Sequence, residues 1–197
     1  MTAPAGDTSD SKARLRARLR AARRGLPPRA RRLAAHQAAR RLLAIRKLRR
    51  YRHWALYLPH GAELDTLPLA RGLWRRGAQV HVPVILPDHR LRWVRWHRHT
   101  PLITAEHRIR RPARAAPARR SRQLQVMVLP VVGFDPRGTR LGAGGGYYDR
   151  IPAALSHRPL RVGYAHAAQE VAQLPRDPWD VPLDCIVTDR SLLWPIG

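Results

Sequence analysis

Short apolar runs alternate with helix-like segments through most of this chain. The runs are rich in valine, leucine and tryptophan, and the segments between them carry apolar residues three or four positions apart. Such an alternation is typical of an α/β sheet with helices on both faces, which binds ligands at the carboxyl ends of its strands. We expect strands within residues 53–59, 78–86, 91–96, 124–134, 161–166 and 185–188, and helices within residues 65–77, 147–155 and 167–174.

Two arginine-rich helices are expected before the first strand. Residues 12–26 place apolar residues at three- and four-residue spacings, and Gly25 and the prolines after it end the helix. Residues 29–48 form the second helix, and most arginines of both are expected on solvated surfaces. Residues 1–11 are expected to form a disordered tail, which leaves residues 12–197 as a single domain. The apolar face of the second helix is expected to comprise Leu33, Ala34, His36, Leu42, Leu43 and Ile45.

The chain is strongly basic. It has 38 lysines and arginines against 13 aspartates and glutamates, a formal net charge of +25. A positive field of this size favours anionic partners, either nucleic acid or a ligand that carries phosphates or carboxylates. Residues 107–122 hold arginine, alanine and proline without an apolar period, and we expect them to form a mobile basic loop.

The sequence indicates a cytoplasmic protein without a membrane partner. No apolar run approaches the roughly 20 residues of a membrane-spanning helix, and the N-terminal residues lack the apolar core of a secretory signal. The single cysteine, Cys185, cannot form an intramolecular disulfide and falls in an apolar run, where a buried thiol is expected.

Residues 140–150, RLGAGGGYYDR, follow an expected strand and the turn DPRG and lead into an expected helix. A glycine loop in this position can present backbone N–H groups to a phosphate, and the helix dipole adds positive charge. The segment lacks the lysine of a P-loop, and Tyr147 stands where the dinucleotide-binding fingerprint needs a glycine. Glycine richness alone leaves a phosphate site and a tight turn equally open.

Carboxylates near this loop are candidates for a magnesium site. Asp149 follows the glycines, and Mg²⁺ takes carboxylate and phosphate oxygens together. Asp177, Asp180 and Asp184 are candidates for a second ligand, and Asp184 immediately precedes the last expected strand. Each acid could instead interact with a helix dipole or cap a turn. The histidines show no zinc-ligand spacing.

Glu63 lies just past the end of the first expected strand. Its neighbours Asp65 and Thr66 are expected to cap the next helix, whereas Glu63 has no evident capping role. In a basic protein such a carboxylate can bind N–H donors of a substrate, and a structural role is the alternative.

Five stretches together resemble the 5-formyltetrahydrofolate cyclo-ligase family: KARLR, YLPHGAELDT, LPVVGFDPRGTRLGAGGGYYDR, VGYAH and WDVPLDCIVT, from about residue 12 to residue 190. The resemblance implies a three-layer α/β/α sandwich with a largely parallel sheet and an N-terminal helical extension. It also implies an ATP-dependent ligase of folate metabolism. In the implied reaction, ATP with Mg²⁺ phosphorylates the formyl oxygen of 5-formyltetrahydrofolate, N10 attacks the resulting carbon, and phosphate leaves as 5,10-methenyltetrahydrofolate forms.

The same resemblance implies roles for individual residues. It implies catalytic roles for Tyr147, Asp149 and Arg140. It implies ATP contacts for Lys12, Arg16, Arg140, Gly142, Ala143, Gly144, Gly145, Gly146, Tyr147 and Tyr148. It implies folate contacts for Leu58, Glu63, Ala143, Gly144, Gly145, Gly146 and Tyr147, and magnesium binding by Asp149 and Asp184.

One position departs from the family pattern. Many members carry Glu-Pro where this chain has Arg111-Pro112, and we hypothesise that Arg111 attracts the glutamate tail of a polyglutamylated substrate. The alternative function is nucleic-acid binding through the basic surface of a retained cyclo-ligase scaffold, for which the net charge is the argument. That alternative explains neither Glu63 nor the pair of Asp149 and Asp184.

Overall fold

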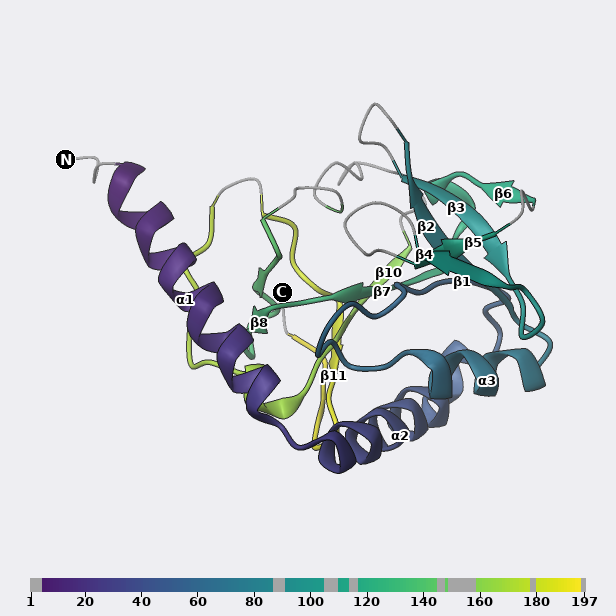
Figure 1. Ribbon diagram of the computed structural model, residues 1–197, viewed down its shortest axis with the longest axis horizontal. Helices are drawn as coiled ribbons and strands as arrows, with labels where there is room; N and C mark the ends of the chain where they lie inside the picture. Colours follow the sequence, from purple (N-terminus) through teal and green to yellow (C-terminus); the bar gives the residue numbers. More distant parts are fainter. Residues whose placement is uncertain are drawn as a thin grey trace.

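The computed structural model describes residues 5–86, 91–104, 110–113, 117–144, 148, 159–177 and 180–195 (Figure 1). Within these ranges an eight-stranded sheet forms the centre of the molecule. In spatial order the strands are β12 (Leu192–Leu193), β11 (Cys185–Val187), β10 (Leu160–Tyr164), β7 (Val126–Pro130), β1 (His53–Ala55), β2 (Gln79–Ile85), β3 (Leu91–Trp96) and β6 (Ala118–Arg119). Strands β11, β10, β7, β1 and β2 run parallel, and β12, β3 and β6 run antiparallel to their neighbours. The expectation of an α/β fold with a largely parallel sheet is confirmed.

The strand register brings several chain segments to one edge of the sheet. Ala55 pairs with Met127, and Pro130 pairs with Tyr164. After β1, β7 and β10 the chain therefore leaves the sheet on the same side. Open α/β sheets bind ligands at this edge.

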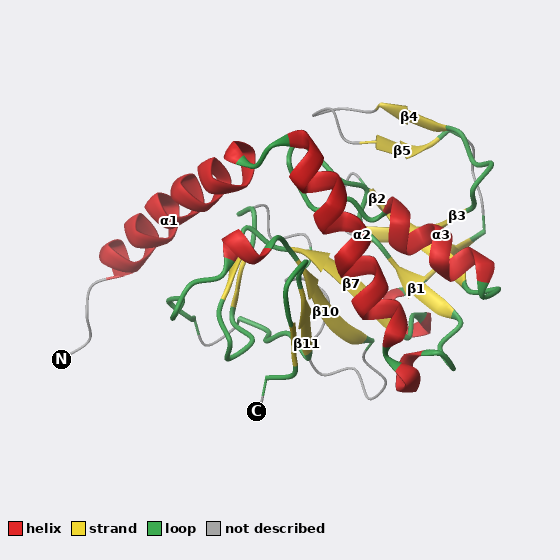
Figure 2. Cartoon of the chain, turned by 90° about the horizontal axis from the view of Figure 1, so that it is seen from below, coloured by secondary structure: helices red, strands yellow, loops and turns green. Residues whose placement is uncertain are grey.

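Helices α2 (Pro28–Ala44) and α3 (Leu67–Arg75) pack together against one face of the sheet (Figures 1 and 2). Each has a proline in its first turn, where the missing N–H costs no hydrogen bond. Leu33 and His36, expected on the apolar face of α2, are exposed because the buried stripe is narrow and consists mainly of alanines. A helix expected over residues 147–155 lies outside the described residues. The buried stripe of α2 comprises Ala34, Ala35, Ala38, Ala39 and Leu42, and η1 (Arg46–Leu48) follows the helix.

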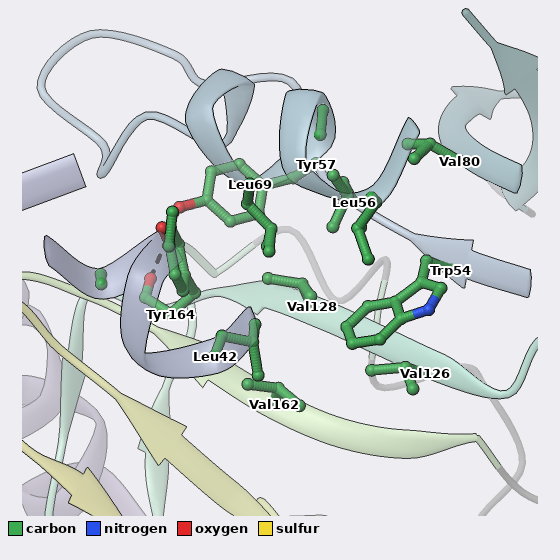
Figure 3. Close-up of a cluster of buried hydrophobic side chains, with 14 of the residues drawn as sticks. Leu42, Trp54, Leu56, Tyr57, Leu69, Val80, Val126, Val128, Val162 and Tyr164 are labelled. Carbon is green, nitrogen blue, oxygen red and sulfur yellow. Dashed lines mark hydrogen bonds between the residues drawn. The ribbon is translucent and has the colours of Figure 1, made fainter. Parts of the chain in front are cut away.

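The core follows the alternation of side chains along the strands. In β7, Val126 and Val128 belong to the cluster under α2 and α3 (Figure 3). Met127 and Leu129 belong to a second cluster on the opposite face. Successive strand residues point to opposite faces, so β7 is buried on both sides.

Leu42→Ala is expected to lower the free energy of unfolding by about 3 kcal/mol. Leu42 is fully buried near Val162, and its truncation leaves a cavity between α2 and the sheet (Figure 3). Chemical denaturation followed by tryptophan fluorescence measures the loss. Leu33→Ala, on the exposed side of the same helix, should cost less than about 0.5 kcal/mol. Equal losses for the two variants would contradict this packing.

Helix α1 (Ala5–Gly25) lies apart from α2 and α3 (Figure 2). It packs against η4 (Ala167–Gln169) and near the hairpin of β8 (Gly133–Phe134) and β9 (Arg140–Leu141). Leu19 forms a small cluster with Val132, Leu141 and Leu174. A Cβ on Gly133 would lie 2.4 Å from a methyl carbon of Leu19, so this glycine allows the close approach. None of the described helices combines the length and apolar character needed to cross a bilayer.

Two expectations about local structure are corrected near this helix. Helix α1 begins at Ala5, so residues 5–11, expected as part of a tail, are helical; serine and aspartate in this stretch suit the first turns of a helix. Residues 167–174 form only the single turn η4 instead of a helix. The side chain of Gln169 donates to the carbonyl of Val131 at 2.6 Å, and the N–H of Val171 donates to the carbonyl of Phe134 at 3.0 Å. These tertiary hydrogen bonds replace helical ones.

Residues 107–122 are also more ordered than expected where the structure describes them. Strand β5 (Arg110–Pro112) pairs with β4 (Leu102–Thr104), and β6 pairs with β3. A short turn, η3 (Ser121–Gln123), leads into β7. Backbone pairing does not require an apolar period, so these strands could not be predicted from the pattern of residues.

Candidate active site

Helix α1 presents a row of cations to the glycine loop. Lys12, Arg16 and Arg20 follow one another at four-residue spacing and share one face of the helix. The Nε of Arg16 donates to the carbonyl of Gly142 at 3.0 Å, and an Nη of Arg20 donates to the carbonyl of Ala143 at 3.0 Å. The first part of the glycine loop is thus fixed to α1 through its carbonyl oxygens.

The ammonium group of Lys12 lies between two aspartates. Its Nζ is 2.6 Å from Oδ2 of Asp177 and 3.2 Å from Oδ2 of Asp180, and its side chain is 12% exposed. Burial alone would lower the pKa of Lys12, but the hydrogen bonds to the two carboxylates outweigh it and raise the pKa. Asp177 and Asp180, considered from the sequence as metal ligands, are therefore the partners of Lys12.

A buried aspartate holds the turn from which the glycine loop begins. Oδ1 of Asp135 accepts hydrogen bonds from the N–H groups of Arg137 and Thr139 at 3.0 Å, and Oδ2 accepts one from Leu174 at 3.0 Å. Gly138 completes the turn with a φ of +86°, a conformation that favours glycine. The motif DPRG predicted the turn, but not the link from Asp135 to residue 174.

Glu63 lies in the loop after β1, at the same edge of the sheet. Its Oε2 accepts a hydrogen bond from the N–H of His60 at 3.0 Å, and its Oε1 is 3.9 Å from Nη1 of Arg23. Burial raises the pKa of Glu63, and the hydrogen bond from His60 and the charge of Arg23 offset part of this rise. The hydroxyl of Tyr57 donates to the carbonyl of Leu64 at 2.6 Å and fixes the loop. A half-buried carboxylate of this kind is a strong acceptor for N–H donors of a ligand.

Tyr148 marks the far end of the glycine loop. It packs on the second core cluster, and its ring centre is 6.4 Å from that of Trp93. Burial raises the pKa of Tyr148 well above its usual range, and the charge of Glu63 adds to this rise while that of Arg140 opposes it. Tyr148 therefore lies within electrostatic reach of both groups. Leu58, another residue predicted to contact folate, is 9% exposed and packs in the core under α2 and α3.

Residues 8–189 match the model of the 5-formyltetrahydrofolate cyclo-ligase family. The chain belongs to this family. The resemblance seen in the sequence is confirmed, and so is the prediction of an enzyme of the ligase class.

Relatives of the cyclo-ligase family match this chain over most of its length. The 5-formyltetrahydrofolate cyclo-ligase of Escherichia coli (strain K12) is 36% identical over 183 residues, which cover 89% of this chain and 98% of the relative. That of Haemophilus influenzae is 33% identical over 159 residues, with 77% and 85% covered. The structure of Aquifex aeolicus 5,10-methenyltetrahydrofolate synthetase superposes with a TM-score of 0.81 at 28% identity and covers 94% of this chain and 93% of the other.

Arg23, whose guanidinium lies 3.9 Å from the carboxylate of Glu63, is a residue of the candidate site that sequence reasoning missed. It is 9% exposed, although the arginines of α1 were expected to be mostly solvated. Burial lowers the pKa of Arg23, and the charge of Glu63 opposes this shift. Arg23 follows Lys12 by about three helical turns, so the two share a face of α1. Arg23 could have been predicted as a site residue from this spacing to Lys12.

The predicted magnesium ligands are described only in part. Asp184 immediately precedes β11, and its Oδ2 accepts a hydrogen bond from the N–H of Arg161 at 2.7 Å. In the part of the chain that the structure describes, no three carboxylate, histidine or cysteine side chains form a metal site. The remaining predicted site residues, Gly145, Gly146, Tyr147 and Asp149, lie outside the described residues. The magnesium pair therefore stays a prediction.

Proposed function

We propose that this cyclo-ligase family member closes 5-formyltetrahydrofolate to 5,10-methenyltetrahydrofolate and consumes ATP, with release of ADP and phosphate. The proposal is supported best by the convergence of three features at the carboxyl edge of the sheet: the cations of α1, the glycine loop and Glu63. The first two suit the phosphates of a nucleotide, and the third suits the N–H donors of a reduced pterin.

The proposed reaction has two chemical steps. The formyl oxygen attacks the γ-phosphorus of ATP, and the bond between this phosphorus and the oxygen of ADP breaks. N10 then attacks the activated formyl carbon and loses its proton, and phosphate leaves with the former formyl oxygen. Phosphoryl transfer depends mainly on positioning and on stabilisation of charge, so the chain need not supply a strong base.

Residues of α1 and of the loop after β1 would each contribute to positioning the substrates and stabilising charge. Arg16 and Arg20 would hold the glycine loop in place for the phosphates, through the carbonyl contacts described above. Lys12 would contact a phosphate oxygen with its ammonium group. Glu63 would accept hydrogen bonds from the pterin and so orient the formyl group toward ATP.

Asp149 and Asp184 would hold a magnesium ion. The donor set fits, because Mg²⁺ is commonly bound by one or two carboxylates together with substrate phosphates. When bound, the ion would neutralise part of the phosphate charge. Arg140, Tyr147 and Tyr148 would complete the surroundings of the phosphates and the formyl group.

The near-ultraviolet absorbance of methenyltetrahydrofolate tests the proposal. We expect product from 5-formyltetrahydrofolate only when ATP and Mg²⁺ are both present. Asp149→Asn is expected to raise the Mg²⁺ concentration for half-maximal rate about tenfold, whereas Glu170→Gln, at an exposed position outside the site, should leave it unchanged. A well-folded protein that forms no product with ATP and Mg²⁺ would contradict the proposal and favour nucleic-acid binding on a retained scaffold.

A further inference from the structure

Arg23 is a buried cation in the last turn of α1, and its guanidinium faces the loop that carries Glu63. Both side chains are largely buried, and Nη1 of Arg23 lies 3.9 Å from Oε1 of Glu63. Nε of Arg23 is buried as well, and it has no hydrogen-bond acceptor in the described part of the chain. Burial of a guanidinium with so few partners costs free energy. Stability alone therefore does not explain a buried arginine at this position.

The position of Arg23 is fixed by the rest of α1 and not only by its contact with Glu63. Leu19, one turn earlier, packs in the small cluster between α1 and the hairpin of β8 and β9. Arg20, three residues earlier, donates to the carbonyl of Ala143 at 3.0 Å. The helix also packs against η4. These contacts hold the guanidinium beside Glu63 in advance, and a preorganised charge needs no reorganisation when a ligand binds.

The surroundings of Glu63 combine burial with several charged groups. Burial raises its pKa, and the hydrogen bond from the N–H of His60 and the charge of Arg23 lower the pKa. Among the described side chains, the charge of Arg23 lowers it most, followed by the charges of His60 and Arg20. His166, which follows β10, adds no charge at neutral pH because burial lowers its own pKa. The other titratable groups near Glu63 in the described chain are Arg31, Arg32 and Arg71 of α2 and α3, Asp65 of the loop, and Tyr57 and Tyr148. The ionised state of Glu63 therefore depends on Arg23 more than on any other described side chain.

The distance between the two groups leaves the carboxylate available to a ligand. At 3.9 Å, Nη1 of Arg23 is too far from Oε1 of Glu63 for a hydrogen bond. The electrostatic attraction persists at this distance, and it is stronger in a half-buried site than in bulk water. Arg23 thus stabilises the charge of Glu63 without occupying the lone pairs of Oε1, which the N–H donors of a pterin can use.

We propose that Arg23 is a positioning residue for the ring closure, which keeps Glu63 ionised and oriented toward the N–H donors of the folate. The inference rests on the proposed function, because it takes a folate as the ligand of Glu63. Helix α1 would then contribute to both ends of the site. Lys12 and Arg16, nearer its start, would serve the nucleotide, and Arg23 in its last turn would serve the folate. Loss of Arg23 should therefore weaken the interaction with the folate and not that with ATP.

Arg23→Met removes the charge and keeps an unbranched side chain in the same space. We expect KM for 5-formyltetrahydrofolate to rise about tenfold, with kcat and KM for ATP within about twofold of the wild type. The fall of kcat/KM in acid should move to higher pH, because ionised Glu63 loses its nearest cation. Arg23→Lys, which keeps a charge, should restore part of the loss. The matched control Arg24→Met removes the cation at the next, exposed position and should leave both KM values unchanged.

A double-mutant cycle tests whether Arg23 acts through Glu63. In the Glu63→Gln background there is no carboxylate to hold, so Arg23→Met should change kcat/KM by less than about twofold. A tenfold loss in this background as well would show a structural role and overturn the inference. An equal rise in KM for ATP, or a loss of the same size in Arg24→Met, would also overturn it.

A titration of the protein without ligands separates this inference from the proposed reaction. The carbon-13 NMR signal of the Glu63 carboxyl group, assigned by its absence in Glu63→Gln, reports the pKa of that group directly. We expect a higher pKa in Arg23→Met than in the wild type and in Arg24→Met, and an unchanged pKa would overturn the inference. Absence of product from the wild type would instead overturn the proposed function, and the titration would still decide whether Arg23 keeps Glu63 ionised.

Discussion

Lys12→Met is expected to lower kcat/KM for the ATP-dependent ring closure by about 100-fold or more. The variant removes a cation that the fold holds at a defined position, with Nζ at 2.6 Å from Asp177 and 3.2 Å from Asp180. An ammonium group has three N–H donors, so one can reach a phosphate oxygen while two remain with the aspartates. Initial rates at varied ATP concentration, followed by the absorbance of the product, measure the loss.

Two companion variants show whether the effect belongs to the position of the charge. Lys12→Arg keeps the charge but replaces a compact ammonium with a planar guanidinium, so it should restore only part of the activity. Arg18→Met removes an exposed cation of the same helix and should change kcat/KM by less than about twofold. A similar loss for Arg18→Met, or retention of more than about a third of the activity in Lys12→Met, would argue against phosphate contact by Lys12.

The parts of the fold that depend on local pattern could be predicted from the sequence. The apolar run in β7 and the periodic residues of α3 identify a strand and a helix without any tertiary information. The local pattern predicted the wrong secondary structure where tertiary hydrogen bonds determine the backbone conformation. Residues 167–174 have helical composition, but the side chain of Gln169 binds carbonyls that follow β7, and only one turn forms.

The motifs of the candidate site could be predicted from the sequence, but the contacts between its residues could not. Glu63 and the glycine loop were recognised because they lie at strand ends and match a family pattern. The ion pair of Lys12 with Asp177 joins residues 165 positions apart, and no local pattern indicates it. The burial of Arg23 could not be predicted, because helical spacing shows which residues share a face of the helix but not which face is buried.

Glu63→Gln is expected to lower kcat/KM for 5-formyltetrahydrofolate by about 100-fold. The amide keeps the shape of the side chain but loses the charge and replaces one acceptor oxygen with a donor, and a hydrogen bond to a charged group contributes about 1.5–3 kcal/mol. Steady-state rates at saturating ATP measure the change. Glu170→Gln, the same substitution at an exposed position outside the site, should stay within about twofold of the wild type.

The pH dependence distinguishes a binding role of Glu63 from a purely structural one. Because burial raises its pKa above the usual 4.5, the wild-type kcat/KM should fall with acid at a pH above 4.5, and this fall should be absent in Glu63→Gln. Stability should change in the opposite direction. A raised carboxyl pKa stabilises the folded state below pH 4.5, and this contribution is lost as the pH rises through the folded-state pKa. Protonation of Glu63 should therefore reduce activity while the fold gains stability. If the acid loss persisted in Glu63→Gln or coincided with unfolding, activity would not depend on this carboxylate.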